Sequence, residues 1–277
     1  MPASDPIKNI PSLNDYYRRI HFGLAAGRMN LAAEPMADCT EQPNFTAVEL
    51  PFDYFSALSA PAREKLLKRF PMVSCGNLFA KELTTMLPMA GKNIQRDFIR
   101  ACRVRMPELA AAGIHCCVLD FSLIQVLGDE MRRKELAQIL RQLHPILYDS
   151  GMMILLPVRL PLPDPGIREK VTAFLRDQMI PGLKLRLEIY PHQLKPDFKP
   201  EDTAGTFRLE TASVLFCCNA DSGNRLLRVH LTPWLRYFAL TSFPGPFLFC
   251  PFSQNNRLAL VESEAFSKLT EEIGKNH

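Results

Sequence analysis

Short apolar runs alternate with amphipathic helical segments along most of this chain, at a spacing of about 30 residues, and this repeat constrains the fold most strongly. Strand followed by helix, repeated eight times, is the pattern of a (β/α)8 or TIM barrel. An open doubly wound sheet is the alternative, but it usually has fewer units, and no glycine-rich phosphate loop follows the first strand here. The expected strands are 20–26, 45–50, 72–77, 114–121, 152–158, 183–190, 212–218 and 247–251, and the expected helices include 62–69, 92–112, 129–148, 167–179 and 262–273.

Composition is consistent with one large globular domain. Of the 277 residues 47% are hydrophobic and 22% are charged, which leaves ample apolar material for a single core. We therefore expect one barrel domain over 1–277, with 1–18 as an N-terminal extension. The formal charge of +4 is small, and both signs are interspersed along the chain, so the sequence does not favour a nucleic-acid partner.

The distribution of apolar residues and cysteines indicates a cytoplasmic protein. No window approaches the roughly 18 uninterrupted apolar residues of a membrane span, and the first residues lack the apolar stretch of a secretory signal. None of the eight cysteines forms a CxxC pair of the kind that binds zinc. We interpret them as small buried hydrophobic side chains in a reducing compartment, without membrane association.

Several helix boundaries carry recognisable signals. Ser59 precedes a helix with Pro61 in its first turn, and Gly113 stands where the helix that follows the third strand should end. In the same way, Thr232 and Pro233 predict the cap and first residue of a short helix that carries Trp234.

The segment 183–192 is the most informative site candidate, because its two faces differ. Leucine and isoleucine alternate with Arg186, Glu188, Tyr190 and His192, and a strand with this alternation places all the polar side chains on one surface. Glu188 and His192 form a carboxylate–imidazole pair suited to acid–base catalysis near neutral pH. The alternative is that Glu188 is an interior acid neutralised by Arg186 or Arg159, with His192 on a solvated loop.

Further polar residues stand at the carboxyl ends of the expected strands, where barrels of this type carry their sites. Arg159 could hold a carboxylate or phosphate by a bidentate contact, or could instead form a salt bridge with Glu188 or Asp120. Several other residues share the parity of residues that we expect inside the barrel: Ala47 with Glu49, Cys75 with Asn77, Val118 with Asp120, and Cys217 with Asn219. We therefore predict ligand binding by Arg159, Glu49, Asn77, Asp120 and Asn219 in one pocket.

Three segments resemble the xylose-isomerase-like barrels, a superfamily of sugar isomerases, epimerases and endonuclease IV repair enzymes. The segment 47–50 resembles the second-strand signature that ends in glutamate, and 113–121 resembles the passage into the fourth strand. Glu188 and His192 loosely resemble the acidic-plus-histidine ending of the sixth strand. The resemblance extends over the whole length and implies a barrel that acts on carbohydrate-like substrates.

The chain departs from that superfamily at the metal ligands. Metal-dependent members generally carry a glutamate at the end of strand five, Asp-x-x-His at strand six, a histidine at strand seven and a glutamate at strand eight. Here 155–159 contains no carboxylate, Glu188 and His192 are one residue too far apart, and neither 217–221 nor 250–253 supplies the remaining ligand. We predict no cofactor, with a divalent metal held by Glu49, Asp120 and Glu188 as the alternative.

The resemblance implies a sugar or sugar-acid isomerase or epimerase that transfers a proton next to a carbonyl. Glu188 or His192 would move the proton, and Arg159 would stabilise the enediolate charge. The alternative is a non-catalytic, metal-free relative that binds a small polyhydroxy or anionic ligand or serves as a scaffold. A phosphodiester-cleaving enzyme is disfavoured because the chain lacks the required cluster of metal ligands.

Overall fold

The structure is a computed structural model that describes residues 20–26, 42–76, 78–79, 87, 91–162, 164–195, 198–201, 207, 209–218, 223–241, 243–251 and 256–275. Its centre is a closed barrel of parallel strands in which each strand pairs with the next along the chain and β8 pairs with β1. This confirms the TIM barrel predicted from the repeat. The strands are β1 (Phe22–Ala25), β2 (Ala47–Pro51), β3 (Met72–Gly76), β4 (Cys116–Val118), β5 (Met153–Leu160), β6 (Leu183–Ile189), β7 (Thr211–Cys218) and β8 (Phe247–Pro251).

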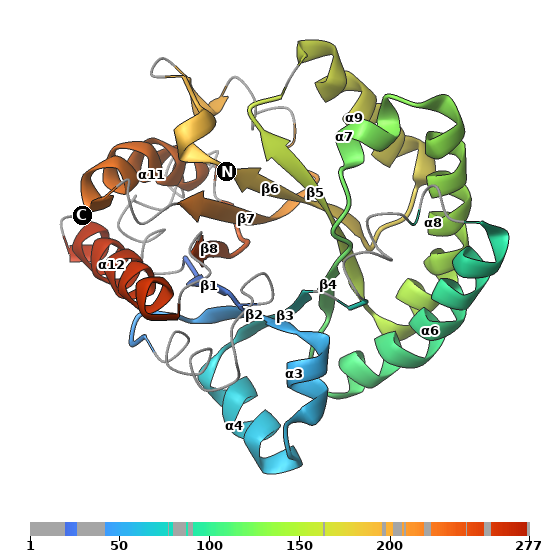
Figure 1. Ribbon diagram of the computed structural model, residues 1–277, viewed down its shortest axis with the longest axis horizontal. Coiled ribbons are helices and arrows are strands. Elements are labelled where there is room, and N and C mark those ends of the chain that lie inside the picture. Colours follow the sequence, from blue (N-terminus) through green and yellow to red (C-terminus); the bar gives the residue numbers. More distant parts are fainter. Residues whose placement is uncertain are drawn as a thin grey trace, which may run out of the picture.

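Helices surround the strands on the outside, as Figure 1 shows. Two short helices that the sequence did not predict, α3 and α7, follow β2 and β4 directly. The helices are α3 (Phe52–Ala57), α4 (Ala60–Arg69), α6 (Lys92–Ala111), α7 (Leu123–Leu127), α8 (Glu130–Ser150), α9 (Pro165–Gln178), α11 (Gly223–Leu240) and α12 (Asn256–Lys275), with a short 3-10 turn η4 at Pro191–Gln193. No helix among the described residues is long and apolar enough to cross a membrane.

Local signals explain where several helices begin and end. The Ser59 side chain accepts a hydrogen bond from the Ala62 amide at the start of α4, as predicted. Asp129 accepts from two amides at the start of α8, so its side chain satisfies two of the orphan N–H groups there. Gly113 follows the end of α6 with φ of +86°, a backbone conformation that favours glycine.

The predicted start of the helix after β7 is wrong. Pro233 lies inside α11, which already begins at Gly223, and does not open a separate short helix. The reason is packing: Leu231, Trp234 and Leu235 are all buried around the proline. Burial of this apolar face outweighs the one backbone hydrogen bond that proline removes.

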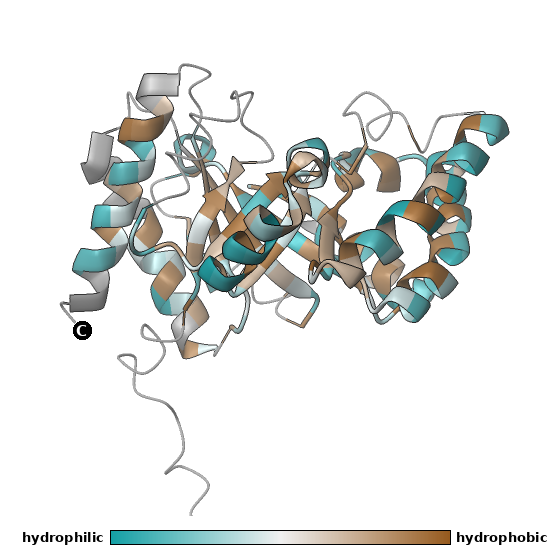
Figure 2. Cartoon of the chain, turned by 90° about the horizontal axis from the view of Figure 1, so that it is seen from below, coloured by the Kyte–Doolittle hydropathy of each residue, from teal (hydrophilic) through white to brown (hydrophobic). Residues whose placement is uncertain are grey.

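Two apolar cores lie on the two sides of the strands. The larger core fills the space between the strands and the helices, and it includes Val48 and Leu50 of β2 together with Leu185 and Leu187 of β6. The smaller core lies inside the barrel and joins side chains of β1, β2, β7 and β8: Ala25, Ala47, Leu215, Cys217, Leu248 and Cys250. Figure 2 shows mostly hydrophobic strands at the centre, with hydrophilic and hydrophobic residues alternating along the surrounding helices. Polar residues that interrupt the inner core are therefore the first candidates for function.

Candidate functional site

Four charged side chains form a continuous network across the inside of the barrel. The Arg186 guanidinium donates from Nη1 to Glu49 Oε2 at 2.7 Å and from Nη2 to Glu188 Oε1 at 2.9 Å. The second Glu188 oxygen, Oε2, accepts from Arg159 Nε at 3.4 Å. The exposed fractions of the side chains are 1% for Glu49, 0% for Arg186 and Glu188, and 59% for Arg159. The network thus runs from the closed centre of the barrel to its surface.

Strand geometry explains why these residues meet. Leu185, Leu187 and Ile189 of β6 belong to the outer core, so the residues between them point into the barrel. Arg159 of β5 stands directly opposite Glu188 in the strand register. Glu49 points inward because its neighbours Val48 and Leu50 belong to the outer core. On both β2 and β6, side chains therefore alternate between the outer core and the barrel interior, which explains the predicted polar face of β6 and the predicted inward position of Glu49.

The network balances charge inside a region that excludes water. A buried guanidinium is costly unless its charge is compensated, and here two carboxylates share that task with short, charge-assisted hydrogen bonds. The Glu49 Oε1 atom is not satisfied in this way: it is buried, and no hydrogen-bond partner for it occurs among the described residues. A Cβ placed on Gly76 would lie 2.8 Å from this oxygen, so the glycine leaves the space that the carboxylate occupies.

The two residues predicted as a catalytic pair lie in different environments. Glu188 is fully buried, whereas His192 is exposed on η4, just beyond the end of β6. Tyr190 is half-buried between them along the chain; its ring centroid is 6.1 Å from that of His192 and 5.8 Å from the Arg159 guanidinium carbon. The described geometry favours the interior, neutralised glutamate over an exposed acid–base pair, and the catalytic role stays a prediction.

The other predicted ligand-binding residues are only partly covered by the structure. Asp120 is half-buried two residues beyond the end of β4. Asn77 and Asn219 lie outside the described residues. The expectation that Cys75 points into the barrel is wrong, because Cys75 belongs to the outer core and pairs in register with Leu50, another outer residue. On β3 the inward positions are therefore those of Ser74 and Gly76.

The described side chains do not fit a divalent metal. Among the residues that the structure covers, no group of three or more His, Cys, Asp or Glu side chains is arranged to hold an ion. The carboxylates of Glu49 and Glu188 that point into the barrel both bind the Arg186 guanidinium. Asp120, the third residue of the alternative metal site, is not grouped with them in a metal-binding cluster. The metal-free site nevertheless stays a prediction.

Thiol chemistry is also disfavoured at the centre of the barrel. Desolvation and, to a lesser extent, the negative charge of Glu49 raise the pKa of the Cys116 thiol to about 12, although the positive charge of Arg186 opposes this shift. A thiol with such a pKa is protonated at neutral pH and is therefore a poor nucleophile and a poor metal ligand.

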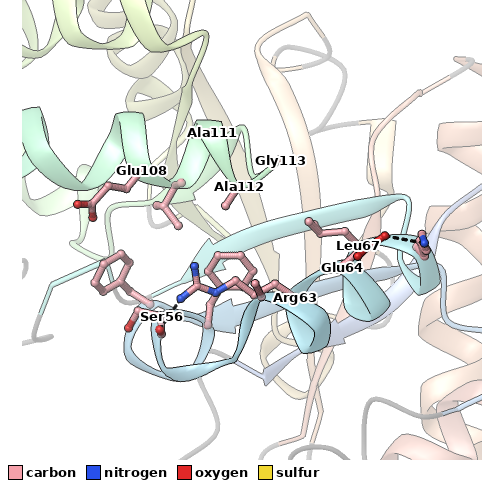
Figure 3. Close-up of a pocket in the computed structure, with 13 residues that line it drawn as sticks. Ser56, Arg63, Glu64, Leu67, Glu108, Ala111, Ala112 and Gly113 are labelled. Atoms are coloured by element: carbon pink, nitrogen blue, oxygen red, sulfur yellow. Dashed lines mark hydrogen bonds and ion pairs between the residues drawn. The ribbon is translucent and has the colours of Figure 1, made fainter.

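A groove of about 1020 Å3 lies outside the barrel, between the α3–α4 pair and the end of α6. Figure 3 shows the Arg63 side chain extending from α4 towards Ser56 of α3, where its guanidinium donates a hydrogen bond to the Ser56 carbonyl oxygen. The charged lining residues are balanced, because Glu64 pairs with Lys68 at 2.7 Å and Glu108 faces the groove from α6. This groove does not join the network inside the barrel.

The closed (β/α)8 barrel is the fold that the sequence resemblance predicted. Similar solved structures are sugar epimerases and a xylose isomerase domain protein. A D-psicose 3-epimerase from Clostridium cellulolyticum H10, solved with D-tagatose, aligns with a TM-score of 0.64 at 11% identity and covers 92% of this chain and 99% of its own. A 3-keto-D-glucoside 4-epimerase from E. coli aligns with a TM-score of 0.63 at 10% identity, covering 90% of this chain and 99% of its own.

A xylose isomerase domain protein from Planctomyces limnophilus gives a TM-score of 0.59 at 12% identity and covers 93% of this chain and 98% of its own. No protein-family model and no curated protein matches the sequence. At these identities the comparisons establish the fold, and the function must be argued from the site.

Arg186 is the functional-site residue that sequence reasoning undervalued. The sequence predicts it only as a possible neutralising partner for Glu188, yet it is the residue that joins β6 to β2 across the barrel. A signal was present: an arginine lies between two leucines in a strand whose apolar residues all have the opposite parity. An arginine at such a position must point into the barrel and requires acidic partners there.

Proposed function

We propose that this protein binds a small polyhydroxy compound with an anionic group, such as a sugar acid or a sugar phosphate, at the carboxyl ends of the barrel strands, and that it does so without a metal. Arg159 would hold the anionic group. Similarity in fold to sugar epimerases supports the polyhydroxy part of this proposal, and one of those neighbours was solved with D-tagatose.

The exposed guanidinium of Arg159 is the observation that carries the proposal. Glu188 contacts only the Nε edge in the described ion pair, while 59% of the side chain is accessible to solvent. The guanidinium also lies over the Tyr190 ring, which restricts its orientation. A guanidinium that is held at one edge and open at the other is suited to bidentate binding of a carboxylate or phosphate.

A binding assay with paired ligands tests this proposal. By calorimetry we expect the protein to bind D-glucuronate or D-fructose 6-phosphate and to bind neutral D-fructose more weakly. Arg159→Gln should weaken binding of the acidic ligands by about ten- to hundredfold, the effect of losing charge-assisted hydrogen bonds. Arg176→Gln is the matched control, since it removes an equal charge from an exposed position near the end of α9.

Two results would contradict the proposal. One is equal affinity for acidic and neutral sugars in the unaltered protein. The other is an equal loss of affinity in the Arg159 and Arg176 variants, which would show a general effect of net charge instead of a contact at the barrel mouth.

The second candidate function is proton transfer next to a carbonyl, as in a sugar isomerase or epimerase, with Glu188 and His192 as acid–base groups. The position of Glu188 favours this candidate, because the carboxylate lies near the end of β6 beside a guanidinium that could stabilise an enediolate. Its burial and its two arginine partners count against it, because both carboxylate oxygens are already engaged in ion pairs. We therefore place binding first.

Deuterium exchange distinguishes the two functions. The protein is incubated with D-fructose or D-glucuronate in D2O, and loss of the proton next to the carbonyl is followed by NMR. Binding without catalysis predicts no exchange above the protein-free rate. Exchange that disappears in Glu188→Gln, with the fold retained by circular dichroism, would establish the isomerase-type chemistry and displace the first candidate.

A further inference from the structure

We propose that the amino end of the barrel contains a second binding site, for a small uncharged molecule with an apolar body and one hydrogen-bonding group. A cavity of about 200 Å3 lies there, at the end opposite to Arg159. Its wall includes the first residue of each of four strands, namely Ala47 of β2, Met72 of β3, Cys116 of β4 and Met153 of β5. The site is thus separate from the proposed sugar site.

Small inward side chains explain why this cavity exists. A TIM barrel interior is normally filled by layers of large branched residues. In this barrel small side chains occupy the inward positions towards the amino end, and four of them line the cavity: Ala47, Ser74, Cys116 and Ser213. Leu155 and Leu248 are the larger inward apolar side chains in the wall. The inward side chains at the amino end of the barrel therefore leave part of the interior unfilled.

Ser213 provides an independent indication that the cavity receives a ligand. Its exposed fraction is 2%, and its Oγ is buried without a hydrogen-bond partner among the described residues. Burial of a hydroxyl that makes no hydrogen bond is unfavourable, so such groups normally have a partner. Because Ser213 lines the cavity, a molecule in the cavity is in a position to supply that partner.

The lining defines the class of ligand. Of the described residues in the wall, none carries a carboxylate, ammonium or guanidinium group, and the one imidazole belongs to His115, an exposed residue. A charged ligand would therefore lose its hydration without a counter-charge. An apolar cavity of about 150 Å3 is large enough for benzene, so this cavity has room for one six-membered ring with a hydroxyl substituent. A phenol or a cyclic alcohol meets both requirements.

Paired probes of equal size test the site. Phenol and toluene differ mainly in one hydroxyl, and their binding to the intact protein is measured by ligand-observed NMR titration. We expect saturable binding of both, with phenol bound more tightly. Ser213→Ala keeps the cavity but removes the hydroxyl, and it should weaken phenol binding about tenfold, the effect of one hydrogen bond, while leaving toluene binding unchanged.

Filling the cavity gives the second arm of the experiment. Ser74→Leu should abolish binding of both probes, and Ala47→Val serves the same purpose if the first variant does not fold, as judged by circular dichroism. Arg159→Gln should leave both affinities unchanged, because its guanidinium is at the other end of the barrel.

Three outcomes would overturn this inference. If neither probe saturates, the cavity holds only solvent. If phenol binds equally to Ser213→Ala, the hydroxyl makes no contact with the probe. If both cavity-filling variants fold and still bind phenol, the probe occupies another place on the protein.

Discussion

Replacement of Arg186 by methionine is expected to be one of the most damaging single changes in this protein. The substitution preserves an unbranched apolar stem of similar length but removes the guanidinium that binds Glu49 at 2.7 Å and Glu188 at 2.9 Å. Removal of one partner from a buried ion pair typically costs about 3–5 kcal/mol, because the other charge stays buried without compensation. Glu188 retains Arg159 at 3.4 Å, whereas Glu49 retains no described hydrogen-bond partner. We therefore expect a loss of about 3–5 kcal/mol in the free energy of unfolding.

Urea denaturation, followed by the fluorescence of the single and buried Trp234, measures this loss. Lys68→Met is the matched control, since it breaks an ion pair of the same 2.7 Å length at the surface, where both side chains are largely exposed. That change should cost less than about 1 kcal/mol.

The triple variant Glu49→Gln, Arg186→Met, Glu188→Gln separates the two possible causes of the loss. If uncompensated buried charge is the cause, neutralising all three residues should recover most of the stability lost in Arg186→Met. The reasoning is refuted if Arg186→Met costs no more than Lys68→Met, or if the triple variant is as unstable as the single one. The latter result would assign the loss to packing.

Two further predictions concern single titratable groups. Burial lowers the pKa of His21 below its usual 6.5, so the folded state disfavours the protonated ring, and the free energy of unfolding should fall as the pH decreases through 6.5 and below. The variant His21→Gln should make this decline shallower. Parallel pH profiles of stability for the two proteins would contradict the prediction. Burial raises the pKa of both the Cys102 and Cys116 thiols to about 12, so iodoacetamide should modify these thiols only after unfolding. Peptide mapping of the native protein treated at pH 7.5 measures this, and alkylation of either cysteine would contradict the prediction.

The barrel could be predicted from the sequence because both parts of its repeat, the short apolar strands and the amphipathic helices, have recognisable sequence patterns. Proline residues show where this kind of prediction fails. The predicted helices 92–112 and 129–148 correctly include Pro107 and Pro145, whereas the prediction that Pro233 starts a helix is wrong. A proline removes one hydrogen bond wherever it lies within a helix, and only the tertiary contacts of the flanking residues decide whether the helix continues. Those contacts cannot be read from the local sequence.

The inward residues could be predicted only where the two faces of a strand differ chemically. On β6 leucine alternates with charge, so Arg186 and Glu188 could be placed inside the barrel together. On β3 the sequence Met-Val-Ser-Cys-Gly offers small or apolar residues at every position, and the parity assigned to Cys75 was wrong. The partnership of Arg186 with Glu49 was beyond prediction for another reason: it joins residues 137 positions apart through the closure of the sheet.

A guanidinium at the centre of this barrel has consequences that a metal ion would not have. Metal ligands must be deprotonated to bind, so a metal site depends on pH and on the supply of the ion. An arginine side chain in a protein keeps its charge without such a dependence, and the planar guanidinium of Arg186 directs Nη1 at Glu49 and Nη2 at Glu188. The positive charge is thereby used to hold β2 and β6 together, and Arg159 is the member of the network that extends to the solvent. This division separates the group that stabilises the barrel from the group that is exposed to solvent, and the proposed binding role of Arg159 depends on that separation.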